Sequence, residues 1–174
     1  CTGSLVPLLG LRTIDDVYLD LAHWEGVFHT RDMLAQFNAW SDRLDVQQAA
    51  IDCCQVRAIP LKPVFSVSVS FIGKRNYTAD EVKNSVADSI TFTHGWTYTA
   101  DDREANLNIR VFVEHEEAYV GVRLGSHAQH ERLYKMVERP GALKPTIAAA
   151  MLRLVDVQPG QRLLDPCCGS GTIL

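Results

Sequence analysis

The last ten residues constrain the chain most, because an Asp-Pro pair is followed, after two cysteines, by two glycines that alternate with two small hydroxyl residues. Residues 165–174 read Asp-Pro-Cys-Cys-Gly-Ser-Gly-Thr-Ile-Leu. Gly169 and Gly171 permit a tight turn and a close approach of the backbone to a ligand. Ser170 and Thr172 suit the start of a helix, whose free N–H groups would face that ligand. We expect a strand that ends over 161–164, then this loop, then a helix, in a unit that holds a nucleotide-like ligand.

The residues before this loop predict the opening of a doubly wound α/β domain. Arg139-Pro140-Gly141 is typical of a joint, and Pro145 suits the first position of a helix. Ile147, Met151 and Leu154 follow at helical spacing and are expected to form its buried face. Because the chain starts at Cys1 and stops at Leu174, before the last expected helix completes a turn, we expect a fragment.

The middle of the chain predicts an α+β unit of its own. Apolar and serine residues alternate over 65–71, which is the period of a half-buried strand. Thr78 and Glu81 have the spacing of a capping box at the start of a helix. Two further alternating runs, 107–113 and 118–124, flank a polar turn and predict a hairpin.

The first sixty residues are less regular. A strand is expected over 17–21 and a helix over 30–40, while 46–56 fits either a helix or a strand. The segment 59–63 contains two prolines and is interpreted as a linker, since proline interrupts a helix. The expected domains are therefore 1–60, 61–138 and 139–174.

Composition narrows the function classes. The formal net charge is −4, which excludes a uniformly basic nucleic-acid binder, but residues 126–174 carry six basic and four acidic groups, so a local basic face is allowed. No apolar run approaches the roughly 20 residues of a membrane helix. Cysteines 53, 54, 167 and 168 form two adjacent pairs without a C-x-x-C spacing, which favours reduced thiols in the cytoplasm and gives no support to a zinc site.

Several other activities lack their motifs. The loop at 165–171 lacks the third glycine of the dinucleotide fingerprint, and no G-x-S-x-G elbow indicates a hydrolase. His127 and His130 have a spacing that could bind a metal on a helix, but no third ligand accompanies them, so we predict no metal.

The cluster Asp165-Pro-x-Cys-Gly-Ser-Gly-Thr-Ile173 closely resembles the first motif of class I S-adenosylmethionine methyltransferases. The wider stretch from Arg139 to Ile173 resembles the THUMP-linked RNA guanine-N2 methyltransferases, and residues 61–138 are similar to a THUMP domain. Residues 1–60 would then correspond, by order, to the ferredoxin-like domain that precedes THUMP in this family. Cys167 replaces a common aromatic residue, and 127–135 lacks a doubled arginine that is often present.

The resemblance implies a fold class and a chemistry. The fold would be α+β ferredoxin-like and THUMP domains followed by the start of an α/β Rossmann-like methyltransferase domain. A methyl group would pass from S-adenosylmethionine to N2 of guanosine in structured RNA, with tRNA as the expected substrate. The catalytic Asn/Asp-Pro-Pro motif of the family is absent from these residues, so the catalytic residues are unknown and the fragment is expected to be inactive. The expected cofactor-binding residues are Asp165, Pro166, Gly169, Ser170, Gly171 and Thr172.

RNA contacts are expected from basic residues of the THUMP segment and the joint after it, because cations neutralise phosphates. They are Lys74, Arg75, Arg132, Lys135 and Lys144. Three alternatives stay open: an rRNA guanine-N2 methyltransferase, a non-catalytic THUMP module that only binds RNA, and a DNA amino-methyltransferase. We expect no membrane partner, and the sequence sets no oligomeric state.

Overall fold

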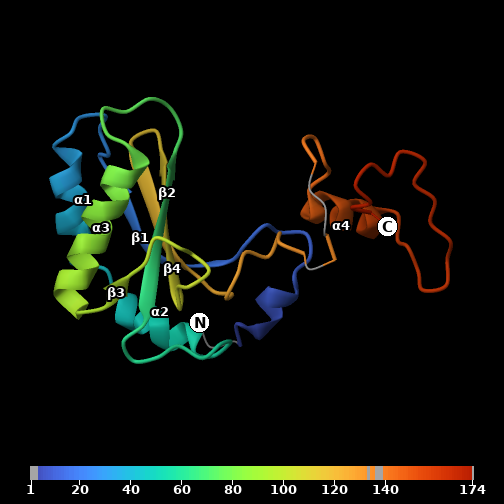
Figure 1. The fold of residues 1–174 in the computed structure, drawn as a ribbon, viewed down its shortest axis with the longest axis horizontal. Coiled ribbons are helices and arrows are strands. Elements are labelled where there is room, and N and C mark those ends of the chain that lie inside the picture. Colours follow the sequence, from blue (N-terminus) through green and yellow to red (C-terminus); the bar gives the residue numbers. More distant parts are fainter. Residues whose placement is uncertain (1–3, 133, 136–138, 174) are drawn as a thin grey trace. The chain divides into compact units, whose positions relative to one another are not determined.

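The computed structural model describes residues 4–132, 134–135 and 139–173, which separate into two compact units (Figure 1). One unit runs from Tyr18 to Ser126. The other combines the N-terminal segment up to Val17 with the residues from His127 onward. No helix in the described ranges is both long enough and apolar enough to cross a membrane.

A five-stranded sheet forms the centre of the unit from Tyr18 to Ser126, with strand order β1-β5-β4-β2-β3. β1 pairs antiparallel with β5, β5 antiparallel with β4, and β2 runs parallel to both β4 and β3. The strands are β1 (Tyr18–Glu25), β2 (Val64–Phe71), β3 (Thr97–Tyr98), β4 (Leu107–Glu114) and β5 (Glu117–Arg123). The alternating runs of the sequence thus form the strands and the hairpin that they predicted.

Helices α1 (Met33–Ser41) and α3 (Ala79–His94) lie together over one face of this sheet, and α2 (Val46–Cys53) lies near its lower end in Figure 1. Alternate residues of β2 and β4 point to these helices, which places the core between them. Phe65, Val67, Ile109 and Val111 are completely buried there. The side chain of Asn38 on α1 donates to the Ser85 carbonyl on α3 over 2.9 Å, which ties the two helices together.

Local signals set the ends of α3. Thr78 accepts a hydrogen bond from the Glu81 backbone N–H at 3.2 Å, and the Glu81 carboxylate accepts from the Thr78 N–H at 2.8 Å. This is the capping box that the sequence predicted. Gly95 ends the helix with φ of 65°, a conformation that glycine adopts without strain.

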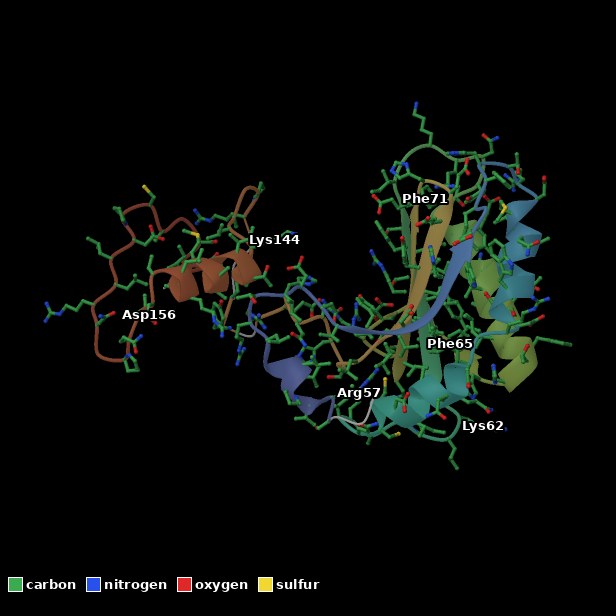
Figure 2. The ribbon with its side chains drawn as sticks, turned by 180° about the vertical axis from the view of Figure 1, so that it is seen from behind. Arg57, Lys62, Phe65, Phe71, Lys144 and Asp156 are labelled. Carbon is green, nitrogen blue, oxygen red and sulfur yellow. The ribbon has the colours of Figure 1, made fainter. Side chains whose placement is uncertain are left out.

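The linker expected at 59–63 does not separate two compact units. Residues 18–58, before the linker, belong to the same unit as the sheet, because β1 pairs with β5 and α2 packs near β1. Arg57, labelled in Figure 2, also fastens this segment to the sheet end, donating to the carbonyls of Asn106, Arg123 and Leu124. Residues 4–60 contain one described strand, so the predicted ferredoxin-like domain is not confirmed.

The second unit contains a short 3-10 helix, η1 (Val6–Gly10), and helix α4 (Pro145–Leu154). Pro145 is at the first turn of α4, as predicted. The predicted buried face is wrong: Ile147, Met151 and Leu154 are 48, 45 and 86% exposed, and Ala148 is buried instead. The expected strand over 161–164 is also wrong, because those residues are irregular and the described part of this unit offers no strand to pair with them.

Candidate functional site

The loop from Asp165 to Thr172 forms two consecutive turns. The Asp165 carboxylate accepts a hydrogen bond from the Cys167 N–H at 2.9 Å, and the Gly171 N–H donates to the Cys168 carbonyl at 2.7 Å. Gly169 and Gly171 have φ of 53° and 72°, in the left-handed region that side chains disfavour. The glycines therefore have the conformational role that the sequence predicted for them.

A cavity of about 280 Å³ opens beside this loop. Four of the six predicted cofactor-binding residues line it, namely Asp165, Gly169, Ser170 and Thr172, whereas Pro166 and Gly171 are not among the lining residues. Cys167, Cys168 and Ile173 complete the loop side. The structure thus brings most of the predicted set together around one space.

The opposite wall of this cavity comes from Gly141, Ala142 and Leu143, which sequence reasoning did not assign to the site. Gly141 has φ of 78°, so the chain turns there just before α4. One sequence signal could have indicated these residues. The stretch Arg139-Pro-Gly-Ala-Leu was part of the resemblance to the methyltransferases, but it was not interpreted as part of the binding site. A ligand in this cavity would therefore contact both the segment before α4 and the glycine loop.

The chemistry of the cavity walls suits a polar, partly cationic ligand. The Asp165 side chain supplies a carboxylate, and the hydroxyls of Ser170 and buried Thr172 lie 3.3 Å apart. Exposed Gly169 leaves room for close approach, because it has no side chain and its ideal Cβ would meet only the Cys167 carbonyl oxygen at 3.9 Å. S-adenosylmethionine, which combines a sulfonium with an amino group and ribose hydroxyls, fits this donor set.

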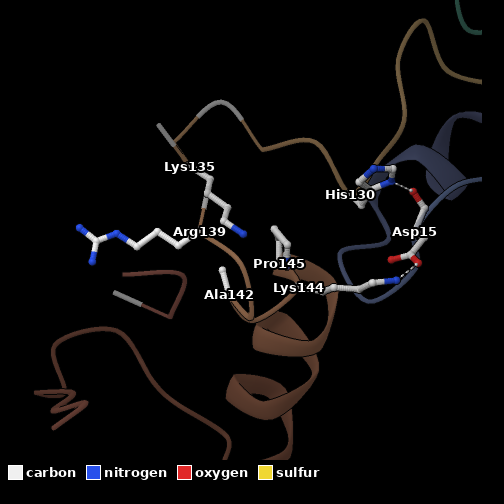
Figure 3. Close-up of a pocket in the computed structure, with 7 residues that line it drawn as sticks. All are labelled: Asp15, His130, Lys135, Arg139, Ala142, Lys144 and Pro145. Carbon is white, nitrogen blue, oxygen red and sulfur yellow. Dashed lines mark hydrogen bonds and ion pairs between the residues drawn. The ribbon is translucent and has the colours of Figure 1, made fainter. Parts of the chain in front are cut away.

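A second cavity, which we call the basic cavity, lies at the N-terminal end of α4 (Figure 3). Its volume is about 270 Å³. It is lined by Asp15, His130, Lys135, Arg139, Ala142, Lys144 and Pro145. Two of the predicted RNA-binding residues, Lys135 and Lys144, therefore lie at one site, together with Arg139.

Asp15 organises one side of the basic cavity. Its carboxylate accepts from the Thr146 hydroxyl at 2.7 Å and pairs with the Lys144 ammonium at 3.5 Å. Its carbonyl accepts from the His130 N–H at 2.9 Å. The hydrogen bond from Thr146 is the main cause that holds the pKa of Asp15 below its ordinary value; burial opposes it, and the charge of Lys144 lowers the pKa further. The carboxylate therefore stays charged and joins the segment before β1 to the start of α4.

The other predicted RNA-binding residues differ in the contacts that their side chains make within the protein. The guanidinium of Arg132 donates a hydrogen bond to the Arg12 carbonyl at 2.9 Å, so one of its donors binds the N-terminal segment. Lys74 is exposed on the turn after β2, and its carbonyl contacts the His29 ring at 2.8 Å.

Arg75 does not present its guanidinium as an open contact surface. The group donates to the carbonyls of Val27 and His115 and to the Tyr77 hydroxyl, and it lies 6.0 Å from the Phe71 ring. These contacts use three of the five N–H donors of Arg75, and its Nε is buried, so few donors remain for an RNA phosphate. Lys74 is therefore the accessible cation of this pair.

Two protein families match the chain. Residues 42–123 match the family described as THUMP domain, and residues 132–174 match the family described as RMKL-like, methyltransferase domain. The THUMP match includes α2, which the sequence analysis assigned to the preceding domain. This agrees with the packing of residues 18–60 in the same compact unit as the sheet.

Two curated relatives and one solved structure are similar to the chain. The chain is 38% identical over 109 residues to a tRNA (guanine(6)-N2)-methyltransferase of Thermus thermophilus, covering 63% of this chain and 32% of that protein. It is 31% identical over 124 residues to a ribosomal RNA large subunit methyltransferase K/L of Saccharophagus degradans, covering 66% of this chain and 16% of that protein. The crystal structure of TrmN from Thermus thermophilus superposes with a TM-score of 0.72 at 28% identity, covering 99% of this chain and 48% of TrmN.

The chain thus spans less than half of the length of each of these relatives. These matches confirm the resemblance that the sequence predicted: residues 42–123 are similar to a THUMP domain, and residues 132–174 are similar to an RMKL-like methyltransferase domain.

Proposed function

We propose that the full-length protein is an RNA methyltransferase that moves a methyl group from S-adenosylmethionine to N2 of a guanosine in structured RNA, with tRNA as the substrate. One observation carries the proposal: the cavity at the glycine loop combines Asp165, Gly169, Ser170 and Thr172 in the segment that follows a THUMP match. The name of the Thermus thermophilus relative supports guanine N2 as the acceptor and tRNA as the substrate.

The residues of this chain would bind and orient the cofactor. S-adenosylmethionine supplies an activated methyl group on a sulfonium centre. Asp165, Ser170 and Thr172 would fix its polar groups, and Gly169 would let the loop backbone approach it closely. Orientation matters because the N2 lone pair of guanine is delocalised into the ring, which makes it a poor nucleophile. We assign no residue of this chain to proton transfer from N2.

The RNA-facing residues in the proposal are Lys74, Lys135, Lys144 and the part of Arg132 that does not bond to Arg12. Arg75 would instead support the turn that presents Lys74. Three-dimensional shape and unpaired ends of the RNA should matter more than sequence, because structured RNA is recognised mainly by shape and backbone contacts.

The remaining features of the proposal concern the whole enzyme. Residues 139–173 would supply the first helix and the cofactor loop of a Rossmann-like domain. The fragment alone would be inactive, since the family's catalytic motif is not in its sequence. We place the enzyme in the cytoplasm, where its cysteines at 53, 54, 167 and 168, all free in the structure, would stay reduced.

The second candidate is an rRNA guanine-N2 methyltransferase, and the K/L relative supports it. The deciding experiment incubates full-length protein and labelled S-adenosylmethionine with unmodified tRNA and with rRNA in parallel, then maps the methylated nucleoside by mass spectrometry. N2-methylguanosine in tRNA is the expected product. The same nucleoside only in rRNA would select the second candidate, and a methylated adenine or no methylated RNA would reject the proposal. A protein that consists of residues 1–174 alone is assayed in parallel, and we expect it to show no methyltransferase activity.

A further inference from the structure

The basic cavity has the charge of a site for one anion. Lys135, Arg139 and Lys144 line this cavity together with a single carboxylate, that of Asp15, so its lining carries a net positive charge even with His130 neutral. The chain as a whole has a formal charge of −4, so this concentration of cations is local. Asp15 offsets only one of these three positive charges, and its carboxylate is already bound by Thr146 and Lys144.

Donors remain available in the basic cavity after its internal bonds are counted. Lys135 uses one N–H on the Leu143 carbonyl at 3.2 Å, and an ammonium has three. Figure 3 shows Lys144 directed at Asp15, with Lys135 and Arg139 on the other side of Pro145. The guanidinium of Arg139 makes no hydrogen bond to the described residues, and its planar donors suit a phosphate.

The size and position of the basic cavity favour a small anion that binds next to the cofactor loop. Its volume of about 270 Å³ lies below the roughly 300–1,000 Å³ of pockets that enclose a drug-sized ligand. Ala142 lines both this cavity and the one at the glycine loop, so the two sites share a wall inside one compact unit. An anion held here lies beside the methyl donor's site without entering it.

We propose that the basic cavity binds one phosphate group of the RNA, and so anchors the strand next to the cofactor loop; this rests on the proposed function. The phosphate is either an internal diester or a terminal monoester, because both present the same oxygens to Lys135 and Arg139. Its binding would position RNA and would leave the affinity for cofactor unchanged.

The test uses full-length protein with Lys135 and Arg139 both changed to Gln, which keeps polar side chains in place. Arg153→Gln is the matched control, because Arg153 is an exposed cation of α4 outside both cavities. The affinity for tRNA is measured over a range of KCl concentrations, with tRNA bearing a 5′-phosphate or a 5′-hydroxyl. Calorimetric binding of S-adenosylmethionine is measured on each variant.

The double variant should bind tRNA about tenfold more weakly, and the slope of log affinity against log salt should fall by about one. If removing the 5′-phosphate weakens only the wild type, the anchored group is terminal; if it affects both proteins equally, the group is internal. Unchanged tRNA affinity and salt slope would overturn the proposal, as would loss of cofactor binding in the double variant. Failure of the proposed function would show separately, as wild-type protein that methylates no RNA.

Discussion

The two compact units differ in where the partners of their apolar residues lie. In β4, alternate residues such as Ile109 and Val111 are completely buried against helices of the same unit. In α4, Met151 and Leu154 have equally regular spacing but are 45 and 86% exposed. A regular apolar pattern therefore predicts a face, while burial of that face requires a second surface. Only the unit from Tyr18 to Ser126 supplies that surface within the described residues.

The largest effect should come from the core of the sheet. Phe65→Ala removes a completely buried ring that contacts Trp96 and Tyr98, and the cavity left behind should lower the free energy of unfolding by about 3–5 kcal/mol. Leu154→Ala, at an 86% exposed position, should change it by less than about 0.5 kcal/mol in residues 1–174. Urea denaturation followed by circular dichroism measures both. Equal losses would show that α4 has a buried face after all.

The same contrast explains which expectations from sequence held. The capping box of Thr78 and Glu81 and the hairpin at 114–117 are closed by partners a few residues away, so their patterns sufficed. The strand over 161–164 needed a neighbouring strand and did not form. Gly141 and Leu143 were missed as cavity residues because they lie more than twenty positions before the glycine loop. The charge of Arg75 predicted an RNA contact, but charge alone does not reveal that three of its donors point at Val27, His115 and Tyr77.

The next effect concerns the cofactor loop. Gly169→Val places a branched side chain at φ of 53° and into the cavity wall, so full-length protein should bind S-adenosylmethionine at least about 100-fold more weakly. Gly160→Val is the matched control, because Gly160 has φ of 88° but lies outside both cavities. Calorimetry should detect normal cofactor binding in the control. Retained affinity in Gly169→Val would remove this loop from the cofactor site.

A third experiment separates the two basic residues of the turn after β2. Arg75→Gln should destabilise the unit by about 1–3 kcal/mol, since the carbonyls of Val27 and His115 would lose a charged donor. Lys74→Gln should leave stability within about 0.5 kcal/mol and weaken tRNA binding instead, because it is an exposed cation. Thermal unfolding and salt-dependent tRNA binding are measured on both variants. The assignment of Arg75 to structure fails if its variant unfolds like the wild type.

The smallest effect tests the capping box through pH. The Thr78 backbone N–H, followed by Arg31, donates to the Glu81 carboxylate and holds the pKa of Glu81 below its ordinary value. A carboxylate whose pKa is lower in the folded state contributes stability above its unfolded pKa of about 4.3, and that contribution is lost as the pH falls through the folded value. Wild-type protein should therefore exceed Glu81→Gln in stability at pH 7, and the difference should shrink between about pH 5 and pH 3. Asp88→Asn, which removes an equal charge from an exposed position of α3, should show a smaller difference across that range. Because the box joins residues only three apart, it should respond in the same way in residues 1–174 and in the full-length protein. A pH dependence that appears only in the full-length protein would mean that distant partners, and not the local contact, set the charge of Glu81.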